Sequence, residues 1–169
     1  MTVEAPSSKD SNIKRVDMMT VLVCYFRGSA ELYGEGLAYA TAGAVGLDLR
    51  ACFEQSNAVI APGERLAVPS GLAIEAQAKD MAGFVYSRSG LGAVKGLTVA
   101  QGVGVIDQDY RGEIIVYLLN TSQTVIEINR GDRVAQLIFQ PVARLEPQTV
   151  DSLTDTERGA GGFGHTGKK

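Results

Sequence analysis

Short runs rich in Val, Ile and Leu alternate with turn signals between about residues 18 and 147, and this alternation constrains the fold more than any other feature. Each turn signal contains a glycine: Pro62-Gly63, Ser70-Gly71, Ala82-Gly83, Arg111-Gly112 and Arg130-Gly131-Asp132. Runs of strand length lie between them, at 65–68, 71–75, 113–119 and 133–139. No window of 12 residues keeps a helical period. The pattern predicts an all-β sandwich or jelly roll.

One short helix is predicted after Ser89, over residues 90–95, because Gly90, Gly92 and Gly96 keep it brief. Residues 1–17 mix charge, Ser and Pro without an apolar period, which predicts a disordered N-terminal arm. The last dozen residues contain five glycines and favour neither strand nor helix. The chain is therefore divided into an arm (1–17), a β jelly-roll domain (18–150) and a mobile C-terminal tail (151–169).

Charge and apolar content exclude several classes of partner. The net charge of −3 gives no overall positive field that would attract nucleic acid. The longest apolar run, 18–26, is far shorter than the roughly 20 residues of a membrane-spanning helix, and no signal peptide precedes it. Two cysteines and one histidine cannot supply a structural zinc site. We expect a cytoplasmic protein that binds neither nucleic acid nor membrane.

A carboxylate interrupts the β pattern at Asp107. In an extended segment, Val103, Val105 and Asp107 share one face, so Asp107 continues an otherwise apolar row. It either caps a turn with Gln108 and Asp109 or acts as a general base at the mouth of a pocket.

Two further segments carry polar groups at positions that suit a ligand. On the run 133–139, Gln136 lies between apolar neighbours, where its amide either satisfies buried backbone groups or donates to a ligand oxygen. In the segment 86–92, Arg88 and two hydroxyls precede a glycine and a helix start. That combination suits phosphate binding, although it also fits a capped turn.

Taken in order, five segments resemble the motifs of the trimeric dUTPases, the deoxyuridine 5′-triphosphate nucleotidohydrolases. The third is the most specific, because it contains Asp-x-Asp-Tyr-Arg-Gly-Glu. The segments are 42–51 (AGAVGLDLRA), 87–91 (SRSGL), 102–113 (GVGVIDQDYRGE), 130–139 (RGDRVAQLIF) and 158–167 (RGAGGFGHTG).

The resemblance implies a jelly-roll homotrimer whose active sites lie at subunit interfaces, each closed by the C-terminal tail of a neighbouring subunit. It implies hydrolysis of dUTP to dUMP and pyrophosphate with Mg²⁺ bound to the triphosphate. The metabolic role that it implies is to remove dUTP, so that uracil is not built into DNA, and to supply dUMP for dTMP synthesis.

Roles for individual residues also follow from the resemblance. Asp107 would activate the water that attacks the α-phosphorus, Tyr110 would pack on the deoxyribose, and the backbone of 102–106 would read the uracil edge. Asp48 would assist the metal through water, while Phe163 would stack over the uracil when the tail closes. Arg88, Ser89 and Gln136 would hold phosphate oxygens, and Arg158 would reach the γ-phosphate. The implied substrate-binding residues are Arg88, Ser89, Gly90, Gln101, Gly104, Val105, Ile106, Tyr110, Gln136, Arg158, Gly162, Phe163, Gly164, His165 and Thr166.

The chain departs from the family pattern at three positions. Ser87 replaces the usual Pro, which we expect to alter only backbone stiffness. Gln101 stands where Asn is frequent and is one methylene longer, so base selectivity is the property in question. His165 stands where Ser is common, either as a solvated tail residue or as a phosphate ligand.

Other functions remain open from the sequence. A dCTP deaminase shares the fold but has a different third segment, so the intact 107–113 sequence argues against it. A catalytically dead nucleotide-binding protein would be expected to lose Asp107 or Phe163, and both are present. A protein-interaction module with a glycine tail predicts no stabilisation by any triphosphate.

We predict that His165, as a cation beside the γ-phosphate, makes substrate binding weaken from pH 6 to 8, because histidine titrates in that range. The measurement is the pH profile of KM for dUTP in the wild type and in His165→Ser. If the wild type and His165→Ser have the same pH profile of KM, His165 is a solvated tail residue and does not bind phosphate.

Overall fold

The computed structural model describes residues 19–162, which form antiparallel β-strands and two short helices. The helices are η1 (Ser29–Tyr33) and η2 (Gly90–Lys95). The strands are β1 (Val21–Tyr25), β2 (Leu47–Arg50), β3 (Asn57–Ile60), β4 (Arg65–Pro69), β5 (Leu72–Ala76), β6 (Met81–Ser87), β7 (Leu97–Val99), β8 (Gly104–Ile106), β9 (Ile115–Asn120), β10 (Ile126–Asn129) and β11 (Arg133–Pro141).

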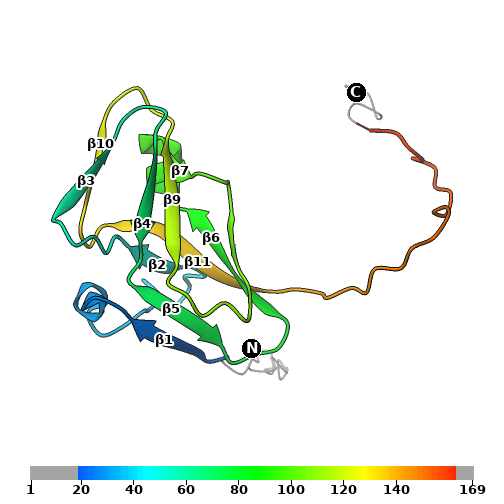
Figure 1. Cartoon of the computed structure of the whole chain (residues 1–169), viewed down its shortest axis with the longest axis horizontal. Helices are drawn as coiled ribbons and strands as arrows, with labels where there is room; N and C mark the ends of the chain where they lie inside the picture. Colours follow the sequence, from blue (N-terminus) through cyan, green and yellow to red (C-terminus); the bar gives the residue numbers. More distant parts are fainter. Residues whose placement is uncertain (1–18, 163–169) are drawn as a thin grey trace, which may run out of the picture.

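The strands form the predicted jelly-roll-like sandwich (Figure 1), although the predicted turn at Ala82-Gly83 is wrong because both residues lie within β6. One sheet has the order β2-β11-β6-β8 and a second has the order β4-β9-β7, while β1-β5 and β3-β10 form two-stranded ribbons. Every pairing is antiparallel. A single core fills the space between the layers, with Leu49 and Leu137 from the first sheet and Val68, Val116 and Leu118 from the second.

The strand-length runs of the sequence match β4, β5, β9 and β11 with boundary shifts of one or two residues. The predicted short helix is η2, which has π-type hydrogen bonding and ends at Gly96 in the left-handed conformation. The prediction of a single helix is wrong, because η1 was missed. Five residues between left-handed Gly28 and Gly34 are too few to show a helical period.

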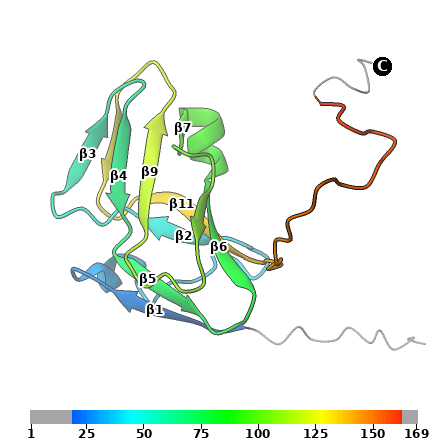
Figure 2. The ribbon, with the colours of Figure 1, turned by 45° about the vertical axis from the view of Figure 1, so that its right-hand side comes forward.

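After β11 the chain leaves the β body and runs away from it without forming a strand (Figures 1 and 2). Leu145 and Leu153 on this segment are each 86% exposed. The predicted N-terminal arm lies outside the described residues, and the division into arm, domain and tail stays a prediction. In residues 19–162, no helix has the length and apolar character needed to cross a membrane.

The turn between β4 and β5 binds the segment that follows β1. The backbone N–H of Phe26 donates to the Gly71 carbonyl over 2.7 Å, and the buried Ser29 hydroxyl donates to the same carbonyl. Tyr33 donates its hydroxyl to the Ser70 carbonyl over 2.8 Å. Burial raises the pKa of Tyr33 to about 12, so the phenol stays protonated and keeps donating at neutral pH.

Gly71 is required at this turn for two reasons. Its φ of +75° lies in the left-handed region, and a Cβ would lie 2.4 Å from the Ser29 Cβ and 2.7 Å from the Cys52 Sγ. Gly63 has a similar φ of +79° but nothing within 4 Å of an added Cβ. Comparing a substitution at Gly63 with one at Gly71 therefore distinguishes the free-energy cost of the left-handed backbone from the cost of overpacking.

We predict that Gly71→Ala lowers the free energy of unfolding by about 2–4 kcal/mol, whereas Gly63→Ala lowers it by about 1 kcal/mol. The extra loss comes from the clash with Ser29 and Cys52, and denaturant unfolding measures both values. Equal losses in the two variants would mean that the turn is not packed as described.

Candidate active site

A pocket of about 290 Å³ is lined by several residues that were predicted from the sequence to form the site. We call it the Asp107 pocket. Six of its lining residues were predicted to bind substrate or to catalyse. They are Gln101, Gly104, Val105, Ile106, Asp107 and Tyr110. The other lining residues are Val85, Val99, Glu113, Ile114, Ile115, Val116 and Tyr117.

Strand β8 supplies one side of this pocket through its pairing with β6. Gly104 faces Val85 across the ladder, and a Cβ at Gly104 would lie 3.2 Å from the Val85 Cβ. The predicted alternation is present, since Val105 is 59% exposed while Gly104 is buried. The row that contains Asp107 therefore faces outward rather than into the core.

Asp107 begins a turn, but its side chain does not cap that turn. The backbone N–H of Tyr110 donates to the Asp107 carbonyl over 3.1 Å. The Asp107 side chain is exposed, and in the described part of the chain no cation or hydrogen-bond donor pairs with its carboxylate. The carboxylate is thus available to accept a proton from a water molecule in the pocket.

Tyr110 is fixed at the pocket wall by its hydroxyl and by a glycine. The hydroxyl donates to the Glu113 carbonyl over 2.9 Å. A Cβ at Gly112 would lie 2.4 Å from the Tyr110 hydroxyl oxygen, so only glycine fits beneath the ring. The ring remains 43% exposed and therefore offers an apolar face to a ligand.

A second group of polar residues, the Asp48 cluster, consists of Asp48, Arg88, Arg133 and Gln136. The Asp48 carboxylate accepts from Arg88 Nε over 2.8 Å and from Arg133 Nη1 over 3.0 Å. Gln136 lies opposite Asp48 in the register of β11 and β2. Its Nε2 donates to the Ser87 carbonyl over 3.2 Å, so one amide hydrogen satisfies the backbone while the other remains for a ligand.

Ser89 and Gly90 lie at the exposed start of η2, beside Arg88. No side chain caps this helix, so the alternative of a side-chain-capped turn is not what forms here. Ser87 accepts a hydrogen bond from the Val99 backbone N–H over 2.8 Å. The serine in place of proline therefore links β6 to β7 as well as changing backbone stiffness.

The Asp107 pocket and the Asp48 carboxylate lie at opposite edges of the four-stranded sheet. Asp48 is on β2 at one edge, and the pocket is built on β8 at the other, with β11 and β6 between them. Three strand spacings correspond to about 14 Å. One chain thus assembles two groups of side chains that are separate from each other.

Of the predicted tail residues, Arg158 and Gly162 fall within the described part of the chain, and neither is brought to the Asp107 pocket or to the Asp48 cluster. Arg158 donates to the Gly161 carbonyl over 3.1 Å, and Gly162 is exposed, on a segment that runs far from the β body (Figure 2). The remaining predicted tail residues lie outside the described part of the structure. They are Phe163, Gly164, His165 and Thr166.

Sequence reasoning missed Arg133 and Glu113 as parts of these groups. Arg133 lies within the fourth motif, next to a register shift in β11, and a charged residue at the start of a strand looks like ordinary solvent exposure. Glu113 accepts a hydrogen bond from the Gly71 N–H over 2.7 Å, although 42 residues separate the two. A local sequence pattern cannot predict a contact between residues so far apart in the chain.

The donor set determines which metal site is feasible. No group of three or more His, Cys, Asp or Glu side chains converges within residues 19–162, so protein atoms alone form no metal cage there. Mg²⁺ keeps several waters and is commonly bound through one or two carboxylates plus substrate phosphates. Asp48 supplies one carboxylate for such a shared site, and because its two oxygens already pair with Arg88 and Arg133, it would reach the ion through a water molecule.

Comparison with known proteins identifies the family. The dUTPase family model matches residues 33–167, which is most of the chain, so the chain belongs to the dUTPase family. Two curated relatives, both named deoxyuridine 5′-triphosphate nucleotidohydrolase, support this. The one from Sodalis glossinidius is 45% identical over 78% of this chain and 87% of its own length. The one from Desulfitobacterium hafniense is 48% identical over 76% of this chain and 85% of its own length.

Solved structures show the same fold. A Staphylococcus bacteriophage 80alpha dUTPase with bound dUpNHpp aligns with a TM-score of 0.74 and 21% identity, covering 88% of this chain and 98% of that one. The dUTPase of Streptococcus mutans aligns with a TM-score of 0.64 and 25% identity over 74% and 98%. A mutant dUTPase from phage phi11 of S. aureus, described with a structural Mg(II) ion, gives 0.68 and 19% over 80% and 99%.

Proposed function

We propose that this protein hydrolyses dUTP to dUMP and pyrophosphate in the cytoplasm, which removes dUTP and supplies dUMP for dTMP synthesis. The observation that carries the proposal is the Asp107 carboxylate, which has no partner within residues 19–162 and lies at a pocket lined by Tyr110. The names and identities of the curated relatives support the choice of substrate.

The base and the sugar occupy the Asp107 pocket. Its volume of about 290 Å³ is near the lower end for ligand pockets, roughly 300 Å³, which suits a nucleoside whose phosphates extend out of the pocket. The backbone of β8 reads the uracil edge with Gln101, and the exposed face of Tyr110 packs on the deoxyribose. A ribose would place its 2′-hydroxyl against that ring.

The chemical step is an attack by water on the α-phosphorus. Asp107 accepts a proton from the water as the new O–P bond forms and the bond from the α-phosphorus to the bridging oxygen breaks. Pyrophosphate departs with the bonding electron pair, and the α-phosphate remains on dUMP. Asp107 then returns its proton to solvent.

The phosphates are held by the Asp48 cluster and the start of η2. Arg88, Ser89, Gly90 and Gln136 donate to phosphate oxygens, and the ion pair with Asp48 orients the Arg88 guanidinium. When bound to the triphosphate, Mg²⁺ neutralises charge and polarises the phosphoryl oxygens. Asp48 would hold that ion through a water molecule.

The active site is completed by other copies of the chain in a homotrimer. The separation of the Asp107 pocket from the Asp48 cluster, and the departure of the tail from the body, support this arrangement. One copy supplies the pocket, a second supplies the cluster, and a tail brings Arg158 to the γ-phosphate and Phe163 over the uracil. Gly162, Gly164, His165 and Thr166 contact the substrate when the tail closes, and this closure excludes water from the site.

We predict that Asp107→Asn lowers kcat for dUTP by at least about a hundredfold and leaves nucleotide binding intact, because only the proton acceptor is removed. Single-turnover kinetics and binding of dUpNHpp measure the two effects. Asp109→Asn is the matched control, an exposed carboxylate two residues away that should leave kcat unchanged. Retained turnover in Asp107→Asn would assign the base to another group.

The substrate is tested by pyrophosphate release from dUTP, dCTP, dTTP and UTP at equal concentration with Mg²⁺. We predict release from dUTP alone and its loss with a chelator, without a fall in Tm, because the side chains of residues 19–162 form no metal cage. Pyrophosphate release from dTTP or dCTP would show that, with Gln101, the pocket accepts bases other than uracil. Ammonia release from dCTP would identify a deaminase, and stabilisation by dUTP without turnover would identify a dead binding protein.

A further inference from the structure

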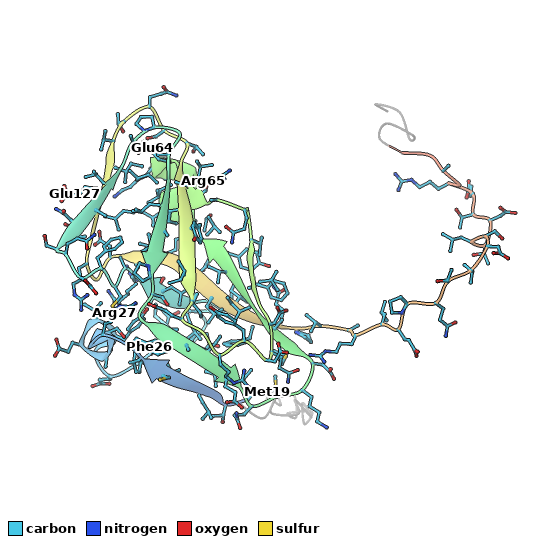
Figure 3. All side chains as sticks on the ribbon, viewed as in Figure 1. Met19, Phe26, Arg27, Glu64, Arg65 and Glu127 are labelled. Atoms are coloured by element: carbon cyan, nitrogen blue, oxygen red, sulfur yellow. The ribbon has the colours of Figure 1, made fainter. Side chains whose placement is uncertain are left out.

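Arg27 contacts the wall of the Asp107 pocket although it lies outside the residues that match the family model, which begin at residue 33. Its Nη2 donates to the Glu113 carboxylate, and Glu113 lines the pocket. The two residues are 86 positions apart. Arg27, labelled in Figure 3, lies where the chain leaves β1 and turns toward η1.

The backbone at Arg27 adopts a conformation that side chains disfavour. Arg27 has a φ of 51° and Gly28 has a φ of 66°, so two successive residues are left-handed. In residues 19–162, Asp80 is the only other non-glycine residue with positive φ. Such a conformation costs free energy and persists where surrounding contacts fix it, frequently at functional sites.

Contacts on both sides hold this turn against the β4–β5 turn. Phe26 donates its N–H to the Gly71 carbonyl over 2.7 Å, and Ser29 donates its N–H to the Phe26 carbonyl over 2.9 Å. Ser29 itself is fully buried. The Arg27 side chain therefore leaves from a fixed backbone position and reaches Glu113.

Glu113 connects Arg27 to Tyr110. Its Oε1 accepts from both Arg27 and the Gly71 N–H, and its side chain is only 16% exposed. Its backbone carbonyl accepts the Tyr110 hydroxyl over 2.9 Å. The hydrogen bond to Glu113 also raises the pKa of the Arg27 guanidinium, which therefore stays charged at any pH used for the enzyme.

We propose that Arg27 is a positioning residue that fixes Glu113 and, through the Glu113 carbonyl, the Tyr110 ring that separates deoxyribose from ribose nucleotides. This inference rests on the proposed function of Tyr110 as the sugar contact. Loss of Arg27 leaves the carboxylate held by one backbone N–H alone. The Tyr110 ring then moves more freely, so a nucleotide with a 2′-hydroxyl binds with a smaller free-energy penalty.

The test measures binding of dUMP and UMP to the full-length protein by calorimetry, in the wild type, Arg27→Ala, Arg27→Lys and Glu113→Gln. We expect Arg27→Ala to weaken dUMP binding about fivefold, as for loss of one partly exposed ion pair, and to change UMP binding less. The dUMP preference over UMP therefore falls. Arg27→Lys restores most of it, because the ammonium can still pair with Glu113.

The control is Arg65→Ala, which removes an exposed arginine at the far end of β4 (Figure 3) that forms no ion pair within the described residues. It should bind both nucleotides as the wild type does. The double variant Arg27→Ala with Glu113→Gln should bind dUMP no more weakly than the weaker single variant, because both act through one contact.

An unchanged dUMP preference in Arg27→Ala, additive losses in the double variant, or an equal loss in Arg65→Ala would overturn the proposal. A fall in Tm with equal weakening of dUMP and UMP would also overturn it, since that is the result of a purely structural role. Binding of dUMP needs neither the metal nor attack on phosphorus. A wild type that binds dUMP over UMP but does not hydrolyse dUTP would contradict the proposed function and leave this inference standing.

Discussion

The pairing of β6 on both of its edges is the constraint on which the site depends. On one edge Tyr86 faces Gln136 of β11, and on the other Val85 faces Gly104 of β8. Because β2 lies beyond β11, this order places the Asp48 carboxylate and the Asp107 pocket on opposite edges. The fold therefore separates the nucleoside-sized pocket from the groups suited to phosphate within each chain, and the proposed trimer reunites them.

Close backbone approach is the second device that shapes the site. Gly104 lets β8 approach Val85, Gly112 lies beneath the Tyr110 ring, and Gly71 fits between Ser29 and Cys52. A Cβ at any of these three glycines would lie closer to a neighbouring side chain than an ordinary van der Waals contact. Each of these neighbouring side chains either lines the site or supports it. The wall formed by Tyr110 is thus set by packing around glycines and by hydrogen bonds to Glu113, rather than by a large apolar surface.

The sequence predicted individual strands well, because the existence of a strand depends on residues close together in the chain. The runs at β4, β5, β9 and β11 are short and rich in Val, Ile and Leu, so their existence follows from residues within a few positions. The order of strands in the sheets does not follow, because β2 and β11 pair across more than 80 residues. The contact of Arg27 with Glu113 is of the same long-range kind, and only the structure shows it.

The candidate site was predicted in part. The resemblance gave six residues of the Asp107 pocket and three of the four in the Asp48 cluster, and the structure brings each group together without testing the assigned roles. It could not give the pairing of Asp48 with Arg133, since an arginine that begins a strand has many possible partners. Nor could it show that Gln136 already uses one amide hydrogen on the Ser87 carbonyl.

The central claim is that one active site combines the Asp107 pocket of one chain with the Asp48 cluster of another. The most direct measurement is dUTP hydrolysis after Asp107→Asn and Arg88→Ala chains are unfolded, mixed in equal amounts and refolded together. Random assembly predicts that about a quarter of the sites receive an intact pocket and an intact cluster, so activity returns to roughly that fraction of wild type. Activity no higher than the sum of the two variants refolded separately would contradict the account.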